Sequence, residues 1–429
     1  ASSEPSPQTD VSTSSPSRGA DVAVGVLCAV QGPAEAVLVQ AVDGSGRLVV
    51  TRRCADLVEL LAAAEAGLGR LALVSAELDH LDRQAVAVLH HAGLRVVCIA
   101  DQARPWLTDR LAACGADLVV PPPGDADAAR GVVERAATLL EATPDQLPDW
   151  VTQVAPGAPG RRGLLAAVWG PTGAPGRTTL AVNLAAELAA LGRPALLVDA
   201  DTYGGAVAQV VGLLDEAPGI AAAARAAGQG VLDAPALARL APLTSPGLRV
   251  LSGVSRPDRW PELPAAALDA VWTAARALVE WTVVDTGFCL ERDEILTYDT
   301  RAPQRNAATL SALAAADVVV VVGAGDPVGV ARLVRGLADL DELGLDAPRL
   351  VVVNRVRASA CGPDPQRAVV GALARYAGVG EALVVPDDRP ACDAALLAGR
   401  TLGERAPGSA ARKAIAGVAA RLAAGLPIR

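Results

Sequence analysis

The residues best suited to chemistry lie in a loop, Gly170–Arg177, between an apolar stretch that ends at Trp169 and a helical pattern that opens at Thr178. Glycines and prolines let such a loop turn tightly and present backbone N–H groups, with the amino end of a helix, to an anion. The loop therefore predicts a phosphate site.

The loop departs from the common pattern G-x-x-x-x-G-K-[ST], because Pro171 stands at the first glycine and Arg177 at the lysine. Arginine keeps the positive charge and can bind phosphate through two N–H groups, but its guanidinium is planar and bulkier than an ammonium group. Thr178 stands where a hydroxyl would complete the coordination of Mg²⁺. Lysine occurs once in the chain, at Lys413, so arginine at this place also fits the general composition.

Alternating strands and helices must position this loop, and they predict an α/β fold with two doubly wound parallel sheets. In residues 163–429 the expected strands are LLAAVW, PALLVDA, LRVLSG, WTVVDT, DVVVVVG, RLVVVN and ALVVP. The helix after the loop carries Leu180, Leu184, Leu188 and Leu191 on one face, and Gly192 is expected to end it.

Residues 21–140 form the other expected domain, with the strands VAVGVLCAV, RLVVTRR, LALVSA, LRVVCIA and DLVVPPP in a flavodoxin-like order. Residues 1–20 are rich in Ser, Pro and Thr and are expected to be a disordered tail. Residues 141–162 gather Pro and Gly and are expected to be a linker.

The sequence from the loop onward resembles the MinD/ParA ATPases, which carry a deviant phosphate loop, K-G-G-x-G-K-T-T. The chain has T-T-x-x-x-N-L-A-x-x-L-A-x-x-G from Thr178 to Gly192, then L-L-V-D-A-D, VVDTG and VVVNRV in order, and VVPDDRPACDAALLAGRTL. The resemblance covers about 260 residues and implies a P-loop NTPase domain that binds ATP and Mg²⁺.

Roles for individual residues follow from this resemblance. It implies that the backbone of the loop and the Arg177 guanidinium would hold the phosphates, with contacts from Gly173, Ala174, Pro175, Gly176, Arg177, Thr178 and Thr179. Thr178 and Asp285 would orient Mg²⁺, Asp199 would support the metal shell, and Asp201 would position the attacking water. Asn354 and Asp388 would contact the base. The simpler alternatives stay open, in which Asp199 and Asp201 end a strand and cap the next element, and Asn354, Asp387 and Asp388 are turn residues.

Both lysines of the family's loop are replaced, one by Arg177 and the upstream one, which in the family reaches across the dimer to the partner's nucleotide, by Thr172. Because about 1 Å of misplacement can slow a reaction roughly a hundredfold, we expect weak or absent hydrolysis. Arg301 and Arg305 are candidates to replace the missing charge.

The five-strand pattern of residues 21–140 resembles a receiver domain. The carboxylates and the lysine of a working receiver are replaced by Ala29–Gln31, Ser75–Ala76 and Pro121–Pro123, so we expect a pseudo-receiver that serves as an interaction module.

A pseudo-receiver before a MinD/ParA domain resembles the CpaE/TadZ proteins of Tad/Flp pilus loci, of the actinobacterial type. The resemblance implies a homodimer that localises or assembles pilus or related secretion machinery through residues 21–140. Two other functions stay open: a cycling ATPase for septum-site selection or chromosome partitioning, and a scaffold that binds no nucleotide.

Composition limits the partners. The formal net charge of −9 argues against nucleic acid as the main partner. The longest apolar runs, such as Val318–Val322, are strand-sized, and no signal peptide is recognised, so a cytoplasmic location is expected. The last helical pattern spaces Ile415, Val418, Leu422 and Leu426 on one face. We expect it to pack on its own domain, and a peripheral contact with the inner face of the plasma membrane is the alternative.

Overall fold

The computed structural model describes residues 23–101, 103–141, 162–173, 176–214, 218–292 and 303–425. The predictions for the tail, for most of the linker, and for Ala174, Pro175, Arg301 and Leu426 lie outside these residues.

The amino-terminal sheet has five parallel strands in the order β2-β1-β3-β4-β5, which is the flavodoxin-like order. One face buries α1 and α5, and the other face buries α2, α3 and α4. Apolar residues line both faces of β3, which is buried along its whole length, as a parallel strand between two helical layers must be. The strands are β1 (Val24–Ala29), β2 (Leu48–Arg53), β3 (Leu71–Ser75), β4 (Arg95–Ile99) and β5 (Leu118–Val120), and the helices are α1 (Pro33–Asp43), α2 (Leu57–Glu65), α3 (Arg83–His91), α4 (Pro105–Ala113) and α5 (Ala126–Glu141).

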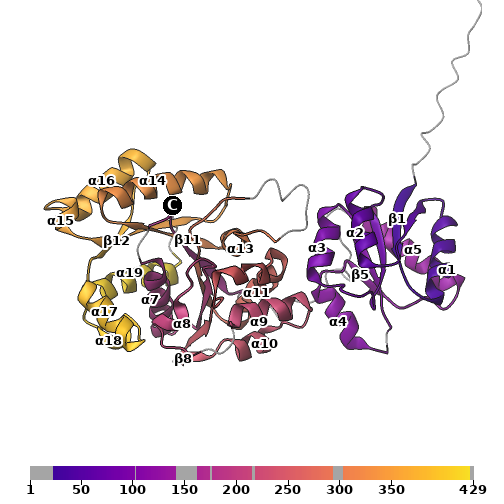
Figure 1. Cartoon of the computed structure of the whole chain (residues 1–429), viewed down its shortest axis with the longest axis horizontal. Coiled ribbons are helices and arrows are strands. Elements are labelled where there is room, and N and C mark those ends of the chain that lie inside the picture. The colour runs from indigo at the N-terminus through magenta and orange to yellow at the C-terminus, as the bar shows by residue number, and fades with distance from the viewer. Residues whose placement is uncertain are drawn as a thin grey trace, which may run out of the picture.

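The second sheet has eight strands in the order β13-β12-β11-β6-β10-β7-β9-β8, and all neighbours are parallel except β8 and β9. Figure 1 shows the two sheets in separate bodies, each wrapped by helices. The strands are β6 (Leu164–Trp169), β7 (Ala195–Ala200), β8 (Leu243–Ser245), β9 (Leu248–Leu251), β10 (Trp281–Thr286), β11 (Val318–Ala324), β12 (Arg349–Val356) and β13 (Leu383–Pro386).

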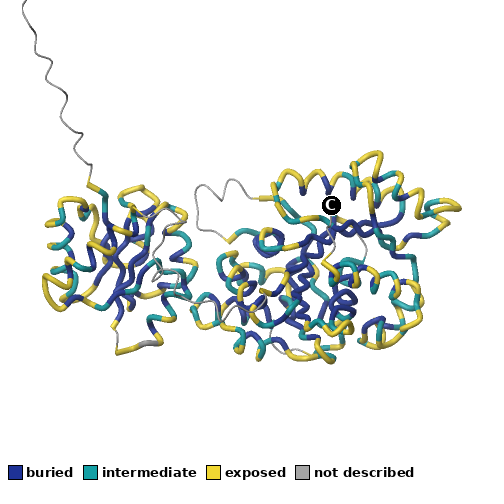
Figure 2. Tube along the Cα trace, turned by 180° about the vertical axis from the view of Figure 1, so that it is seen from behind, coloured by how far each residue is buried: buried dark blue, intermediate teal, exposed yellow. Residues whose placement is uncertain are grey.

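Two helical layers cover this sheet, one on each face. The central strands between the layers are buried, as the dark blue segments in Figure 2 show. One layer holds α9 (Gly219–Gly228), α10 (Ala234–Leu240), α11 (Ala265–Leu278), α13 (Ala307–Ala315), α14 (Pro327–Glu342) and α16 (Pro365–Ala377). The other holds α7 (Arg177–Ala190), α8 (Val207–Val210), α17 (Arg389–Ala398), α18 (Leu402–Arg405) and α19 (Ala410–Ala423). Two short elements complete the described chain, the 3₁₀ turn η2 (Pro257–Glu262) and α15 (Ala358–Cys361).

The predicted fold class is confirmed, and every expected strand is present. One strand, β8, a short antiparallel strand at the sheet edge, was not predicted. On the apolar face of α7, Leu180, Leu184 and Leu188 are buried, whereas Leu191 at the end of the helix is 50% exposed. Gly192 has a φ of +76° and follows the end of the helix as expected. Within the described ranges, no helix is long and apolar enough to cross a membrane.

The two bodies touch through α4 and the end of α9. The Arg110 guanidinium donates to the carbonyl oxygen of Gln229 at 3.1 Å, and the Cys114 thiol lies 3.8 Å from the carbonyl oxygen of Gly228. At Gly230, which has a φ of +69°, a side chain would collide with Arg110 and Cys114. This close backbone approach explains why a glycine occupies the position.

The last helix packs on α7, as expected, with Ile415, Val418 and Leu422 buried. The Arg412 guanidinium makes two hydrogen bonds of 2.7 Å to the carboxylate of Glu187, a residue of α7 that is only 4% exposed. A buried carboxylate is tolerated only when such a partner compensates for the lost water.

Replacement of Arg412 by alanine should therefore lower the free energy of unfolding of the second body by about 3 kcal/mol, because it leaves Glu187 buried and unpaired. Urea unfolding followed by tryptophan fluorescence measures the change. Lys413→Ala, at the exposed neighbouring position, is the matched control and should change the free energy by less than about 0.5 kcal/mol. Equal effects of the two substitutions would contradict this role for the ion pair.

Candidate functional site

The phosphate loop runs from the end of β6 to the start of α7. Gly173 and Gly176 have φ values of +70° and +91°, a region in which an L side chain is strained. Space is also limited at both positions, because a Cβ atom at Gly173 would overlap the Arg332 guanidinium and one at Gly176 would overlap the Asn354 amide. Backbone conformation therefore requires glycine at both of these positions.

Arg177 is the first residue of α7, and its side chain folds back over the loop. Its Nη1 donates to the carbonyl oxygen of Gly170 at 3.0 Å, and its Nη2 lies 3.3 Å from Oδ2 of Asp201. The side chains of Arg177 and Asp201 are 14% and 8% exposed. The guanidinium thus joins the start of the loop to the acidic residue that follows β7.

Asp201 uses both carboxylate oxygens for contacts within the protein. Oδ1 accepts from the backbone N–H groups of Tyr203, at 2.9 Å, and Gly204, at 3.2 Å, which is an Asx turn. Oδ2 faces Arg177. Asp201 therefore lies beside the loop, as predicted. It also caps the following turn, which was the simpler alternative.

Asp199 and Asp285 lie side by side because the parallel pairing of β7 and β10 places them in register. Asp199 is buried, and it accepts from the N–H groups of Asp201 at 3.2 Å and Val207 at 3.0 Å. Burial raises the pKa of Asp199 to about 7, although these backbone hydrogen bonds lower it. Asp199 therefore shapes the turn after β7.

Asp285 is fully buried, and neither of its carboxylate oxygens accepts a hydrogen bond from any described residue. Burial and the nearby charge of Asp199 raise the pKa of Asp285 well above its usual value, and the Thr178 hydroxyl, which faces this carboxylate without the geometry of a full hydrogen bond, opposes the shift. A buried carboxylate without donors is costly unless a cation compensates it.

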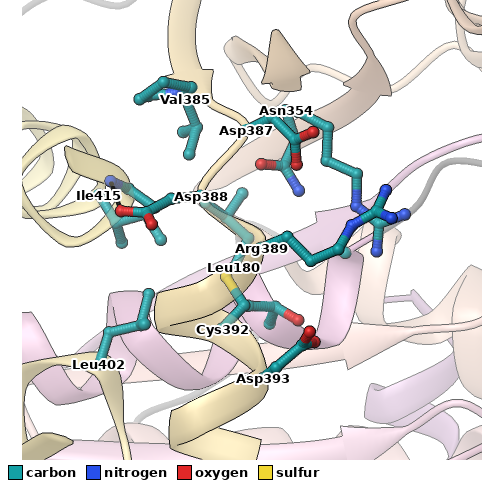
Figure 3. Close-up of a pocket in the computed structure, with 15 residues that line it drawn as sticks. Leu180, Asn354, Val385, Asp387, Asp388, Arg389, Cys392, Asp393, Leu402 and Ile415 are labelled. Atoms are coloured by element: carbon teal, nitrogen blue, oxygen red, sulfur yellow. Dashed lines mark hydrogen bonds between the residues drawn. The ribbon is translucent and has the colours of Figure 1, made fainter. Parts of the chain in front are cut away.

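A small pocket of about 150 Å³ opens against Gly176 and Thr179. Figure 3 shows Asn354 and Asp387, from the ends of β12 and β13, at one end of the pocket and Leu402 at the other. The predicted base contact Asp388 lines the pocket, but its Oδ2 accepts from the N–H groups of Ala410, at 3.0 Å, and Ala411, at 3.4 Å. This carboxylate therefore caps α19.

The structure brings most of the predicted site residues to one edge of the sheet. Thr178, Arg177, Asp201, Asp199 and Asp285 gather around the loop, and Asn354 lies against Gly176. Arg305 does not replace the missing charge at the loop. Its guanidinium donates to Thr202, at 2.7 and 3.1 Å, and stacks on Tyr203 at 3.8 Å from the ring centre. The donors of Arg305 are directed instead to the turn after β7.

One residue at the loop was not predicted from the sequence. Arg332 reaches Gly173 from α14, an element that no motif connects to the phosphate loop. The only sequence signal would have been its place on the same helical face as Gly336, and a glycine inside a helix is too common a feature to identify a contact.

No protein-family model matches the chain, and a comparison with curated proteins finds no match. Among solved structures, the chain is similar to the cell division ATPase MinD of Pyrococcus furiosus, with 20% identity, coverage of 61% of this chain and 99% of that chain, and a TM-score of 0.47. It is similar to a ParA family ATPase from Chlorobium tepidum, with 17% identity, coverage of 60% and 98%, and a TM-score of 0.49. It is also similar to the septum site-determining protein MinD from Pyrococcus horikoshii, solved with Mg-ADP, with 19% identity, coverage of 61% and 95%, and a TM-score of 0.47.

The raised pKa values of Asp199 and Asp285 give the ligand-free protein a defined pH dependence. Between the ordinary carboxyl range near pH 4 and about pH 7, the folded state binds more protons than the unfolded state at these groups. Their contribution to stability is therefore greatest at low pH and is lost as the pH rises through this window.

Asp285→Asn should raise the stability of the ligand-free protein at pH 8 by about 1–3 kcal/mol, because it removes an uncompensated buried charge, and it should flatten the slope between pH 5 and 8. Urea unfolding at several pH values tests this. Asp317→Asn is the control, because Asp317 is paired with Arg276 and accepts from the N–H group of Leu165 at 2.7 Å; this variant should be less stable at pH 8. A destabilised Asp285→Asn protein at pH 8 would refute the interpretation.

Proposed function

We propose that the chain binds Mg–ATP as a MinD/ParA-like nucleotide switch whose hydrolysis is weak or absent. The observation that carries this proposal is the combination of a glycine loop at the amino end of α7 with the buried, unpartnered carboxylate of Asp285 directly beside Thr178. An anion favours the first feature and a cation favours the second. A metal–triphosphate ligand provides both charges at this spacing.

The donor set fits Mg²⁺. Magnesium is usually held by one or two carboxylates together with phosphate oxygens and water, and no group of three or more His, Cys, Asp or Glu side chains in the described part of the chain forms a metal cage of its own. Thr178 and Asp285 would hold the ion directly or through water. Asp199 would support that shell through its place beside Asp285, since its own oxygens accept backbone hydrogen bonds. Bound Mg²⁺ would neutralise charge on the phosphate oxygens.

Weak hydrolysis is supported by the contact between Arg177 and Asp201. A residue that positions water needs a free carboxylate oxygen, but Oδ1 of Asp201 accepts two backbone N–H groups and Oδ2 faces Arg177. An arginine at this place can hold phosphate and still compete for the acid that the reaction would use. Binding therefore survives the replacement of lysine more readily than chemistry does.

The finer role that we propose is a homodimeric localisation or assembly factor for Tad/Flp pilus or related secretion machinery. The sequence resemblance to the CpaE/TadZ proteins supports it, together with the five-stranded body before the nucleotide-binding body. In this proposal residues 21–140 recruit the machinery. Because these residues contact the end of α9, a conformational change in the second body on nucleotide binding can reach them through that helix.

Nucleotide binding can be tested on the full chain by thermal unfolding. Mg–ATP should raise the melting temperature of the wild type, and Arg177→Ala and Asp285→Asn should remove most of that shift, because each deletes one charge of the metal–triphosphate site. Arg193→Ala is the control, since this residue pairs with the half-exposed Glu280 away from the loop. An unshifted wild type would support the scaffold without nucleotide and remove the proposal.

Hydrolysis is expected to respond to Arg177→Lys. Because an ammonium group would contact phosphate without the second N–H group that reaches Asp201, this variant should turn over ATP roughly ten- to a hundredfold faster than the wild type. A phosphate-release assay measures the rate, with Arg193→Lys as the control. If Arg177→Lys binds ATP but stays as slow as the wild type, the contact with Asp201 is not what limits turnover.

The cellular role needs a separate experiment. A fluorescent fusion should form foci together with the pilus or secretion ATPase of the same cells, and deletion of residues 21–140 should disperse the foci while leaving ATP binding intact. Foci that follow the chromosome or the division septum instead would favour the partitioning or septum-site alternative.

A further inference from the structure

A second arginine, Arg332, lies at the phosphate loop, against Gly173. Arg332 projects from α14, and its guanidinium packs directly against Gly173, where any side chain would collide with it. Arg332 is exposed. Across the part of the chain that the structure describes, no hydrogen bond or ion pair occupies its donors.

The backbone position of Arg332 is fixed by the packing of its helix. Gly336 lies one turn later on the same face of α14, and a Cβ atom there would lie 3.0 Å from the Trp169 ring and 3.1 Å from Pro171. The absence of a side chain at Gly336 thus lets the helix approach the end of β6 and the start of the loop. A residue four positions earlier must then lie above the next part of the loop, which is Gly173.

The two ends of the loop can be assigned to the two ends of a nucleotide. The pocket that holds Asn354 opens at Gly176 and Thr179, so a base and its ribose would lie at that end. The phosphate chain would then extend along the loop toward Gly173 and the acidic residues after β7 and β10. Arg332 therefore stands at the distal end.

We propose that Arg332 binds the terminal phosphate of ATP and supplies, from α14 of the same chain, the positive charge that Thr172 cannot provide. This inference rests on the proposed binding of Mg–ATP. A guanidinium with free donors beside a backbone anion site is suited to a two-pronged contact with phosphate oxygens. The contact would distinguish a triphosphate from a diphosphate, because only the triphosphate reaches Gly173.

The surroundings of Arg332 allow this role. The open cleft of about 830 Å³ beside the loop is lined by Thr172 and Arg332, by Arg292 and Arg335, and by Glu291, Asp339 and Glu342. The acids would compete for Arg332 only weakly, since none is paired with it. Arg335 lines the same cleft, and its Nε donates to the carbonyl oxygen of Ala331 in its own helix at 3.4 Å, which makes it a matched control on the same helix.

The test is calorimetric titration of the full chain with Mg–ATP and with Mg–ADP, for the wild type, Arg332→Ala, Arg332→Lys and Arg335→Ala. Arg332→Ala should weaken Mg–ATP binding roughly ten- to a hundredfold, because the contact with the terminal phosphate is lost. Mg–ADP lacks that phosphate, so its binding should weaken by less than about threefold. Arg332→Lys should recover only part of the ATP affinity, because an ammonium group keeps the charge but not the two-pronged contact, and Arg335→Ala should match the wild type. The melting temperature without nucleotide should be the same for all four, since Arg332 is exposed.

The outcomes separate this inference from the function on which it rests. A wild type that binds neither nucleotide removes the proposed function. A wild type that binds Mg–ATP while Arg332→Ala binds it equally well, or loses ATP and ADP affinity in equal measure, overturns the role of Arg332 alone. Tighter binding by Arg332→Ala would also overturn it, because the guanidinium would then be an obstruction in the loop.

Discussion

The parallel pairing of β10 between β6 and β7 is the constraint on which the candidate site depends. Parallel strands bring their carboxyl ends to one edge of the sheet, and the register of these three strands places Asp285 level with Asp199 on one side and with Val168 on the other. The phosphate loop starts just beyond Val168. A shift by one residue would turn Asp285 to the opposite face of the sheet, so the acidic and the anion-binding parts of the site depend on the same backbone hydrogen bonds.

A balance of charge follows from that arrangement. Asp285 accepts no hydrogen bond from any described residue, and Arg177 compensates the charge of Asp201. Buried ionic groups are costly to maintain, and such strain is common where a protein prepares a surface for a ligand. The ion pair of Arg177 stabilises the loop and also restrains the acid that hydrolysis would need.

Most of the fold could be predicted from the sequence, because strands buried on both faces read as continuous apolar runs. Val318–Val322 became part of β11, and the leucines of α7 at positions 180, 184 and 188 are buried as their spacing indicates. β8 was missed since three half-exposed residues at a sheet edge leave no such pattern. Leu191 shares the apolar face of α7 by its spacing but is half-exposed, because periodicity does not report where the packed part of a helix ends.

The site was predictable to the extent that it lies within one segment or one motif. Arg177, Thr178 and the acids that end β7 and β10 are marked by their neighbours in sequence, and the structure gathers them at the loop. The partners of a long side chain are not marked in this way. Arg305 turned to Thr202, Asp388 to the start of α19, and Arg332 to Gly173, and each direction depends on how two helices pack rather than on local spacing.

The pocket against Gly176 and Thr179 is completed late during synthesis of the protein on the ribosome. Ala411 and Ile415 of α19 line this pocket, and the helix is held there by Asp388 and by the pair of Arg412 with Glu187. The loop at Gly173–Gly176 is made much earlier in synthesis than this helix. A nascent chain would thus carry an incomplete pocket until α19 emerges and docks, so the proposed affinity for a nucleotide would be complete only after that step.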